Sequence, residues 1–218
     1  MADMTLPGTV QMVDDVPAAF ARLVADVVTG SIALSGGETA EECYRALRGV
    51  PVDWPAVDVF YGDERFVPVD HPDSNEGMTR RVLLDHVPVH AIHSMYQPIA
   101  IDDAARAYDA LVRAAPPIDL VHLGLGPDGH TASLFPGSPA LEETERLVVP
   151  NGDDLHPQPR LTFTFPAIAR ARVVVVTVAG TDKRAAVERI RAGEDLPAAR
   201  IRGERVVWLG DRAAMGGH

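Results

Sequence analysis

Two patterns of hydrophobic positions alternate along the chain, one typical of helices and one typical of strands. Apolar residues at helical spacing predict amphipathic helices over Val16–Val28, Thr39–Leu47, Glu76–His86, Ile101–Ala114 and Lys183–Arg191. Short apolar or β-branched runs predict strands over Ser31–Leu34, Val57–Tyr61, Ile118–Leu125, Leu147–Pro150, Arg160–Thr164, Val173–Ala179 and Val206–Leu209. Because strands and helices alternate throughout, we expect an α/β fold, with a mainly parallel, Rossmann-like sheet and helices on both faces.

The remaining segments are predicted to be irregular. Asn151–Pro159 is polar and contains proline, which indicates a loop, and Gly193–Arg205 has no clear period. Pro166 is expected to open a short helical turn. The chain contains no internal repeat, low-complexity tract or linker. We therefore expect its 218 residues to form one domain spanning 1–218.

Composition and charge narrow the possible partners. The hydrophobic share of 46% and charged share of 23% are those of an ordinary globular protein. A net charge of −11 argues against nucleic acid as a partner, so an anionic ligand needs a local cluster of Arg or Lys. The single cysteine, Cys43, excludes an internal disulfide and is read as a small buried hydrophobe. With no signal peptide and no apolar run of about 18 residues, we expect a cytoplasmic protein without a membrane partner.

The loop after the strand at Ile118–Leu125 is the first candidate for chemistry. It is rich in glycine and contains Asp128 and His130, at the strand end where open α/β sheets bind ligands. Gly124–Gly129 formally matches the dinucleotide pattern GxGxxG, but that motif opens a long helix and Pro136 follows too closely. In the alternative reading Asp128 or Thr131 merely caps a helix and His130 lies on the surface.

Two earlier loops also follow predicted strands. Ser35–Thr39 places a glycine pair between a strand and a helix, which either aims backbone N–H groups at an anion or makes a plain tight turn. Gly62–Pro68 is highly charged and leads through His71–Asn75, where Asp73 or Ser74 is expected to cap the next helix. Charged loops of this kind are usually just solvated.

Three histidines, His86, His90 and His93, have a spacing that suggests a metal site. Pro88 breaks the helix between the first two, so they do not share a helix face. We read them as turn and surface residues and expect no metal.

Five segments, in order, resemble one family. They are SGGET at Ser35–Thr39, YGDERFVP with HPDSN over Tyr61–Asn75, LGLGPDGHTASLFPG at Leu123–Gly137, RLTFT at Arg160–Thr164 and GTDKRAAV at Gly180–Val187. Together they resemble the 6-phosphogluconolactonases, which share a fold with glucosamine-6-phosphate deaminases. The resemblance covers about Val16 to Met215 and implies a sugar-phosphate isomerase/deaminase type of domain. It also implies cofactor-free hydrolysis of 6-phospho-D-glucono-1,5-lactone to 6-phospho-D-gluconate, a step of the oxidative pentose phosphate pathway.

The resemblance assigns roles to residues of this chain. His130 is expected to be the base that activates water, and Asp128 to orient it or stabilise its charged form. N–H groups near Gly126 and Gly129 are expected to hold the oxyanion. The substrate-binding residues are expected to be Arg65, Asp63, Asn75 and Gly129, and the phosphate-binding residues Gly36, Gly37, Thr39, Arg160 and Lys183. By themselves, Arg160 on a strand and Lys183 at a helix start are better explained as surface residues.

Two positions depart from the family pattern. Glu38 replaces a hydroxyl residue in the phosphate loop, so its side chain has to point away or weaken binding. Ala169 stands where the family has an asparagine. Neither position is the expected base.

Three other functions fit the sequence less well than the lactonase does. A glucosamine-6-phosphate deaminase places a carboxylate five residues after the histidine, where this chain has Phe135, and tends to have tyrosine in place of Arg65. A non-catalytic sugar-phosphate sensor has no need of His130, and the chain offers no helix-turn-helix or basic patch as its output. A metal-dependent lactonase needs a ligand cluster that the sequence lacks. The expected partner is a small phosphorylated sugar lactone, bound by a monomer.

Overall fold

The computed structural model describes residues 6–153 and 156–216. Within these ranges the strands are β1 (Thr9–Met12), β2 (Ser31–Leu34), β3 (Asp58–Tyr61), β4 (Asp63–Arg65), β5 (Ala91–Ile92), β6 (Leu120–Leu123), β7 (Val148–Asp153), β8 (His156–Phe163), β9 (Val173–Val178) and β10 (Arg205–Gly210). The helices are α1 (Val16–Val27), α2 (Glu38–Leu47), α3 (Asn75–Val82), α4 (Ile101–Ala114), α5 (Phe165–Ala169), α6 (Arg184–Arg191) and α7 (Arg212–Met215).

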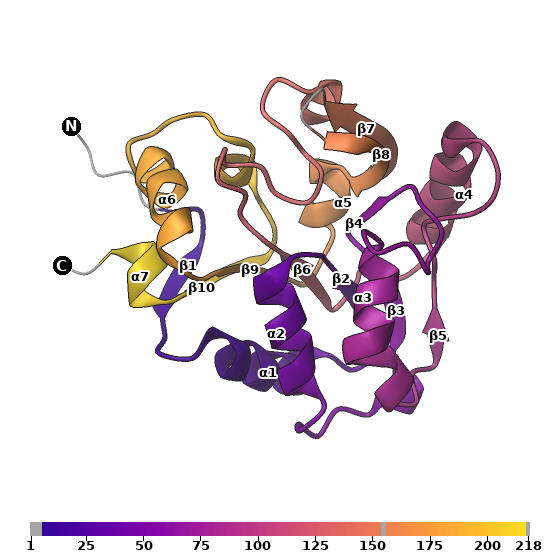
Figure 1. Ribbon diagram of the computed structural model, residues 1–218, viewed down its shortest axis with the longest axis horizontal. Helices are drawn as coiled ribbons and strands as arrows, with labels where there is room; N and C mark the ends of the chain where they lie inside the picture. Colours follow the sequence, from indigo (N-terminus) through magenta and orange to yellow (C-terminus); the bar gives the residue numbers. More distant parts are fainter. Residues whose placement is uncertain (1–5, 154–155, 217–218) are drawn as a thin grey trace.

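Seven parallel strands form the main sheet, in the order β1-β10-β9-β6-β2-β3-β5. From β1 to β5, each successive strand of this sheet lies closer to the β5 edge. The later strands β6, β9 and β10 lie successively closer to the β1 edge. Right-handed crossovers then place α1 to α3 on one face and α4 to α6 on the other, and Figure 1 shows α1 and α2 on the opposite side of the sheet from α5 and α6. The strand order reverses between β2 and β6, where α/β sheets bind ligands.

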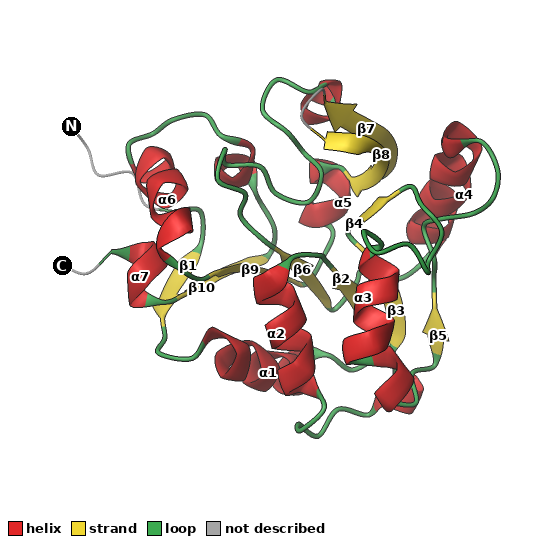
Figure 2. Cartoon of the chain, in the orientation of Figure 1, coloured by secondary structure: helices red, strands yellow, loops and turns green. Residues whose placement is uncertain are grey.

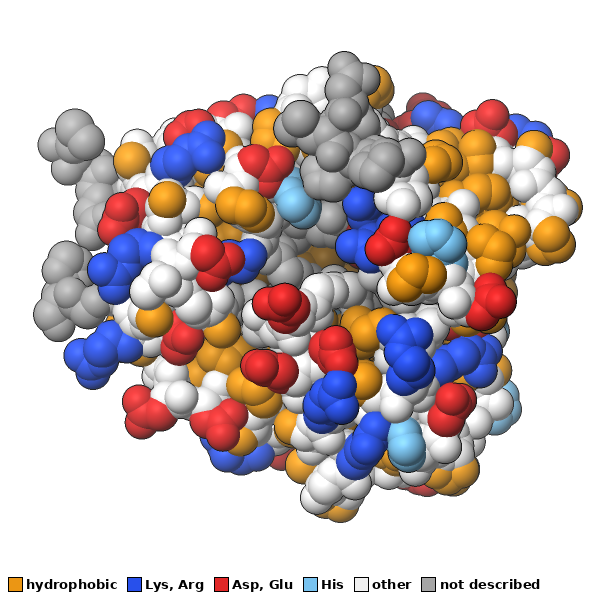
Figure 3. All heavy atoms as spheres, in the orientation of Figure 1, with side chains coloured by type: hydrophobic (Ala, Val, Ile, Leu, Met, Phe, Trp, Pro, Cys, Tyr) orange, Lys and Arg blue, Asp and Glu red, His pale blue; other side chains and the backbone are white. Residues whose placement is uncertain are grey.

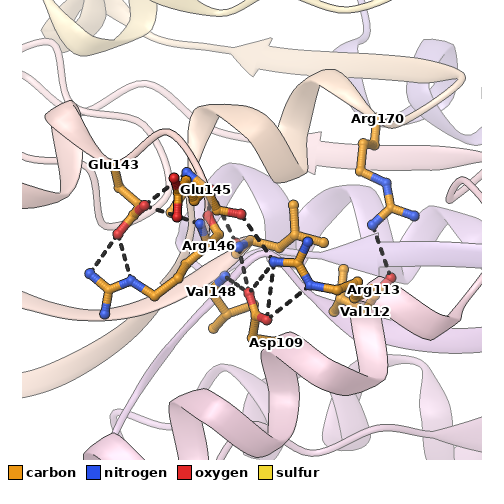
Figure 4. A network of polar contacts seen from close by, with 10 residues as sticks. Asp109, Val112, Arg113, Glu143, Glu145, Arg146, Val148 and Arg170 are labelled. Atoms are coloured by element: carbon orange, nitrogen blue, oxygen red, sulfur yellow. Dashed lines mark hydrogen bonds and ion pairs between the residues drawn. The ribbon is translucent and has the colours of Figure 1, made fainter.

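A second sheet lies apart from the first, as Figure 2 shows. It contains β4, β8 and β7, all antiparallel. The carboxylate of Asp109 on α4 accepts the backbone N–H groups of Leu147 and Val148 at 2.5 and 3.2 Å, and also pairs with Arg113. Figure 4 shows this network, which fixes the start of β7 to α4.

The expected fold class is confirmed, and so are most of its elements. The strand over Ser31–Leu34 and the helix over Ile101–Ala114 have the predicted bounds. The helix predicted over Glu76–His86 instead ends at Val82, because Leu83 leaves helical geometry before a short 3₁₀ turn. Cys43 is fully buried, as expected.

One predicted loop is wrong. Most of Asn151–Pro159 belongs to β7 and β8, which pair with each other across a register shift between Asn151 and Asp153. The prolines of this stretch argued against a strand, but edge and irregular strands tolerate them. The short strands β1, β4 and β5 were not predicted either. Among the described residues, no helix is long and apolar enough to cross a membrane.

Candidate active site

A polar hollow of about 210 Å³ lies at the carboxyl ends of β2 and β6, where the strand order reverses. Figure 3 shows a depression near the middle of one face, with His and Lys or Arg atoms around it. The residues that line the hollow are Ser35, Gly36, Gly37, Asp63, Arg65, Asn75, Gly124, Leu125, Gly126, Pro127, His130, Ala132, Arg160 and Lys183. Residues from the five separated sequence segments therefore meet in one place.

His130 and Asp128 form a hydrogen-bonded pair on the rim. His130 Nδ1 lies 2.6 Å from Asp128 Oδ1, which also accepts the His130 backbone N–H. Burial raises the pKa of Asp128, but the hydrogen bonds from His130 and the charge interaction with its ring outweigh burial, so the pKa lies below its ordinary value. The carboxylate therefore stays ionised at neutral pH and fixes the ring by Nδ1, which leaves Nε2 as the reactive nitrogen.

Glycines allow the loop to fold this tightly. A Cβ on Gly126 would lie 2.1 Å from His130 Nδ1, and Gly129 has a φ of +91°. The N–H of Gly126 donates to the carbonyl of His130, and the N–H of Gly129 donates to the carbonyl of Gly126. The N–H groups of these two glycines are therefore used inside the loop, and an oxyanion donor near Gly126 and Gly129 stays a prediction for the neighbouring N–H groups.

Phe135 lies between the base and an arginine. Its ring makes an edge contact with His130, with centroids 5.0 Å apart, and lies 5.6 Å from the guanidinium carbon of Arg160. Phe135 is 1% exposed. A rigid buried ring thus limits how both functional side chains can turn.

The charged loop after β3 is built around Glu64. Its carboxylate accepts the N–H groups of Arg65, Asn75 and Glu76 and the hydroxyl of Ser74. Burial raises the pKa of Glu64 to about 7, against the lowering effect of these four bonds. Glu64 therefore satisfies buried N–H groups at the start of α3, for which Ser74 is the N-cap, as one of the two expected caps.

The capping bonds of Glu64 hold Asn75 at the wall of the hollow. Its side-chain N–H donates to the Asp63 carbonyl at 2.9 Å, while its Oδ1 faces Gly36 so closely that a Cβ there would lie 1.9 Å away. The carboxylate of Asp63 accepts the hydroxyl of Ser133 at 2.7 Å. Asp63, Asn75 and Ser133 are all buried, so these polar groups are held rigidly.

The antiparallel pair β4 and β8 brings two cations together. Arg65 and Arg160 are direct partners in the register, and both line the hollow. Arg65 Nη1 donates to the carbonyl of Asp73 at 2.6 Å. Like charges opposite each other on neighbouring strands are destabilising. Such a pair is typical of a site that binds an anion.

The glycine pair and the start of α2 form the opposite wall. Gly37 is the N-cap of α2 with a φ of +99°, and as a glycine it has no side chain with which to cap the first N–H groups of that helix. Glu38 is exposed, so its side chain does not fill the loop. Lys183 lines the same hollow and pairs with Asp182 at 3.0 Å. A helix start beside a lysine favours an anion.

The structure thus brings together most of the predicted site residues. Thr39 lies in an adjoining hollow that shares Gly36, Gly37 and Lys183 with the first. Gly129 does not line either hollow, and its carbonyl accepts the N–H of Ala198. Sequence reasoning missed Ser133, which lies in the recognised segment but has no chemical signature of its own.

Ala132 was also missed. It lines the hollow and has a φ of +47°, which is uncommon for a residue with a Cβ. Nothing in the sequence marks such a position.

The described residues contain no group of three or more His, Cys, Asp or Glu side chains that could hold a metal. His86 and His90 are exposed, in agreement with their reading as surface residues. His93 is only partly exposed, because its ring stacks on Phe60 with centroids 4.4 Å apart.

Comparisons with known proteins identify one family as similar to this chain. Residues 9–208 match the family described as glucosamine-6-phosphate isomerases/6-phosphogluconolactonase. The 6-phosphogluconolactonase of a Synechocystis strain is 43% identical over 209 residues, covering 88% of this chain and 86% of the relative. That of Rattus norvegicus is 36% identical over 202 residues, covering 84% and 79%. The crystal structure of the Thermotoga maritima 6-phosphogluconolactonase aligns with a TM-score of 0.81 at 27% identity, covering 93% of this chain and 99% of that one.

Proposed function

The chain belongs to the glucosamine-6-phosphate isomerase/6-phosphogluconolactonase family, and we propose that it hydrolyses 6-phospho-D-glucono-1,5-lactone to 6-phospho-D-gluconate in the oxidative pentose phosphate pathway. The observation that carries the proposal is that His130, which is paired with Asp128, lines the same hollow as Arg65, Arg160 and Lys183. A base and a cluster of cations are what a phosphorylated lactone requires.

Nε2 of His130 acts as the base. It removes a proton from a water molecule, whose oxygen attacks the lactone carbonyl carbon to form a tetrahedral intermediate. Asp128 stabilises the resulting imidazolium through Nδ1. The intermediate collapses by breaking the bond from the carbonyl carbon to the ring oxygen. His130 then returns its proton to that oxygen, which becomes a hydroxyl.

The oxyanion needs donors besides the N–H groups of Gly126 and Gly129, which donate within the loop. Arg65 and Arg160 are the cationic donors on the wall of the same hollow. A guanidinium in a water-poor site stabilises developing charge more than it does in solution. We assign this role to Arg65, with Asp63 and Asn75 binding the sugar hydroxyls, and give Gly129 the role of shaping the loop.

The phosphate group binds between the glycine loop and the cations. Gly36, Gly37 and Thr39 supply the start of α2, while Lys183 and Arg160 neutralise the dianion. Arg offers a planar fork and Lys a point charge, so together they recognise both the shape and the charge of a phosphate. The exposed Glu38 leaves room for it.

We further infer a cytoplasmic monomer that works without a cofactor. The proposed base and cations, His130, Arg65, Arg160 and Lys183, all belong to one chain, so the proposed reaction calls for no residue of a second copy. The lone, buried Cys43 suits a reducing compartment. Sedimentation equilibrium of the purified protein tests the first point, since a stable dimer would contradict it.

The test compares the wild type with His130→Ala on freshly generated 6-phosphoglucono-δ-lactone, corrected for spontaneous opening. We expect the wild-type rate to exceed the variant's by about 10²–10⁴-fold. Binding of 6-phosphogluconate, measured by calorimetry, should be similar in both. Absence of wild-type turnover, or ammonia release from glucosamine 6-phosphate, would contradict the proposal.

A further inference from the structure

The backbone of Ser35, which precedes the glycine pair, is held on both sides by one hydroxyl. Its N–H donates to the Tyr44 hydroxyl at 2.7 Å, and its carbonyl accepts from the same hydroxyl at 3.2 Å. Tyr44 lies on α2, the helix that the glycine pair opens. Both residues are buried, so water does not compete for these bonds. The glycine loop is therefore tied to its own helix.

His122 extends this hydrogen-bond network through the centre of the sheet. It lies on β6 and is fully buried. Its Nδ1 is 2.8 Å from the Tyr44 hydroxyl and its Nε2 is 2.8 Å from the hydroxyl of Thr177 on β9. Thr177 lines the adjoining hollow together with Lys183. Four residues thus connect three neighbouring strands, β2, β6 and β9, directly beneath the cationic end of the site.

The hydrogen-bond count selects one form of the imidazole. Burial lowers the pKa of His122 to about 3, so the ring is neutral at pH 7 and carries a single N–H. With the proton on Nδ1, the ring donates to Tyr44, whose own proton is then free for the Ser35 carbonyl, and Thr177 donates to Nε2. With the proton on Nε2, the Tyr44 proton is drawn to Nδ1 and the Ser35 carbonyl loses its donor. The form with the proton on Nδ1 therefore gives every polar group in this hydrogen-bond network a partner.

We propose that His122, fixed as the Nδ1–H tautomer, is a positioning residue that works through Tyr44 to hold the glycine loop in the shape that binds a phosphate monoester. The inference rests on the proposed function, and it assigns a task to a buried histidine that the reaction itself does not use. A preorganised loop lowers the cost of binding, because its N–H groups need not be ordered when the phosphate arrives.

The test replaces Tyr44 by phenylalanine, which removes the central hydroxyl and keeps the ring. We expect KM for the phosphorylated lactone to rise about five- to tenfold, the range for one lost hydrogen bond, with kcat changed by less than about twofold. The affinity for inorganic phosphate should fall by the same factor. Turnover of unphosphorylated glucono-1,5-lactone should not change. The matched control is Tyr61→Phe, since Tyr61 is equally buried and its hydroxyl contacts Thr79, away from the loop.

Equal losses on both lactones, or equal losses in Tyr61→Phe, would overturn the proposal, because they indicate a general loss of packing. Should Tyr44→Phe fail to fold, ¹⁵N NMR of the wild-type histidine decides the matter. A proton on Nδ1 of His122 supports the proposal and a proton on Nε2 overturns it. A wild type that binds phosphate without any turnover contradicts the proposed function alone, and the inference is then judged on the phosphate affinities of the two variants.

Discussion

Arg65 and Arg160 face each other as direct cross-strand partners on β4 and β8. Their side chains leave the same side of the small sheet and line the same hollow. Two guanidinium groups in this arrangement give the hollow a positively charged wall that attracts an anion.

This relationship predicts that Arg160 contributes to anion binding. We expect Arg160→Met to lower the affinity for 6-phosphogluconate at least about tenfold, because a guanidinium that lines the hollow is replaced by an uncharged side chain. Calorimetry measures the affinity.

Salt serves as the control for this prediction. Ions screen the attraction between the guanidinium and the phosphate, so the difference in affinity between the wild type and Arg160→Met should shrink in about 1 M salt, where the Debye length is about 3 Å. Equal affinities of the two proteins at low salt would contradict a contact between Arg160 and the phosphate.

A second prediction concerns the contact between the glycine loop and α3. Gly36→Ala places a methyl group 1.9 Å from Asn75 Oδ1, and Asn75 is held by Glu64 and Asp63. The loop has to move, so we expect phosphate affinity to fall at least about tenfold. Gly49→Ala is the control, since Gly49 lies just beyond the other end of the same helix and has room for a methyl group. Unchanged affinity in Gly36→Ala would show that Asn75 yields instead.

Gly126→Ala should lower the catalytic rate and leave binding unchanged, in contrast to Gly36→Ala. The new methyl group would lie 2.1 Å from His130 Nδ1 and 2.8 Å from Asp128 Oδ1, so the base and its partner are driven apart. We expect kcat to fall by about 10²-fold or more, the usual contribution of general base catalysis, while binding of 6-phosphogluconate is retained. Steady-state kinetics with calorimetry separates the two. A rise in KM alone would show that Gly126 shapes the binding wall only.

Much of this site follows from sequence because its parts are local. The tight Asp128–His130 loop and the glycine pair after β2 are defined by neighbouring residues, so their motifs predict them directly. The order of elements also predicts the α/β fold, since strands that alternate with helices have few topologies available.

The contacts between distant segments were not predictable in this way. The register that sets Arg65 opposite Arg160 depends on a three-residue strand with no hydrophobic period. The bond from Ser133 to Asp63 joins side chains 70 positions apart. The hydrogen bonds of Gly126 and Gly129 were not predictable for a related reason: glycine content predicts the bend of a loop but not which of its N–H groups donate within the bend.

The last prediction concerns stability and pH at Asp119, which precedes β6. Its Oδ2 accepts the N–H groups of Thr29, Gly30 and Ser31, which tie the start of β2 to β6. Burial raises the pKa of Asp119, but these bonds outweigh it, so the pKa lies below the ordinary value of 3.8. A lowered carboxyl pKa gives stability that is fully present above the unfolded-state value and is lost as the pH falls through the folded-state value.

Asp119→Asn should therefore lower the free energy of unfolding by about 1.5–3 kcal/mol at pH 7, the range for hydrogen bonds to a charged group. The difference from the wild type should narrow below about pH 4, because acid protonates the wild-type carboxyl and weakens the same bonds. Urea unfolding across this pH range provides the measurement. Asp103→Asn is the control, since Asp103 is exposed and pairs only with Arg106 among the described residues. A constant difference at all pH values would mean that the amide disrupts the packing at the start of β2 and that the charge of Asp119 contributes little.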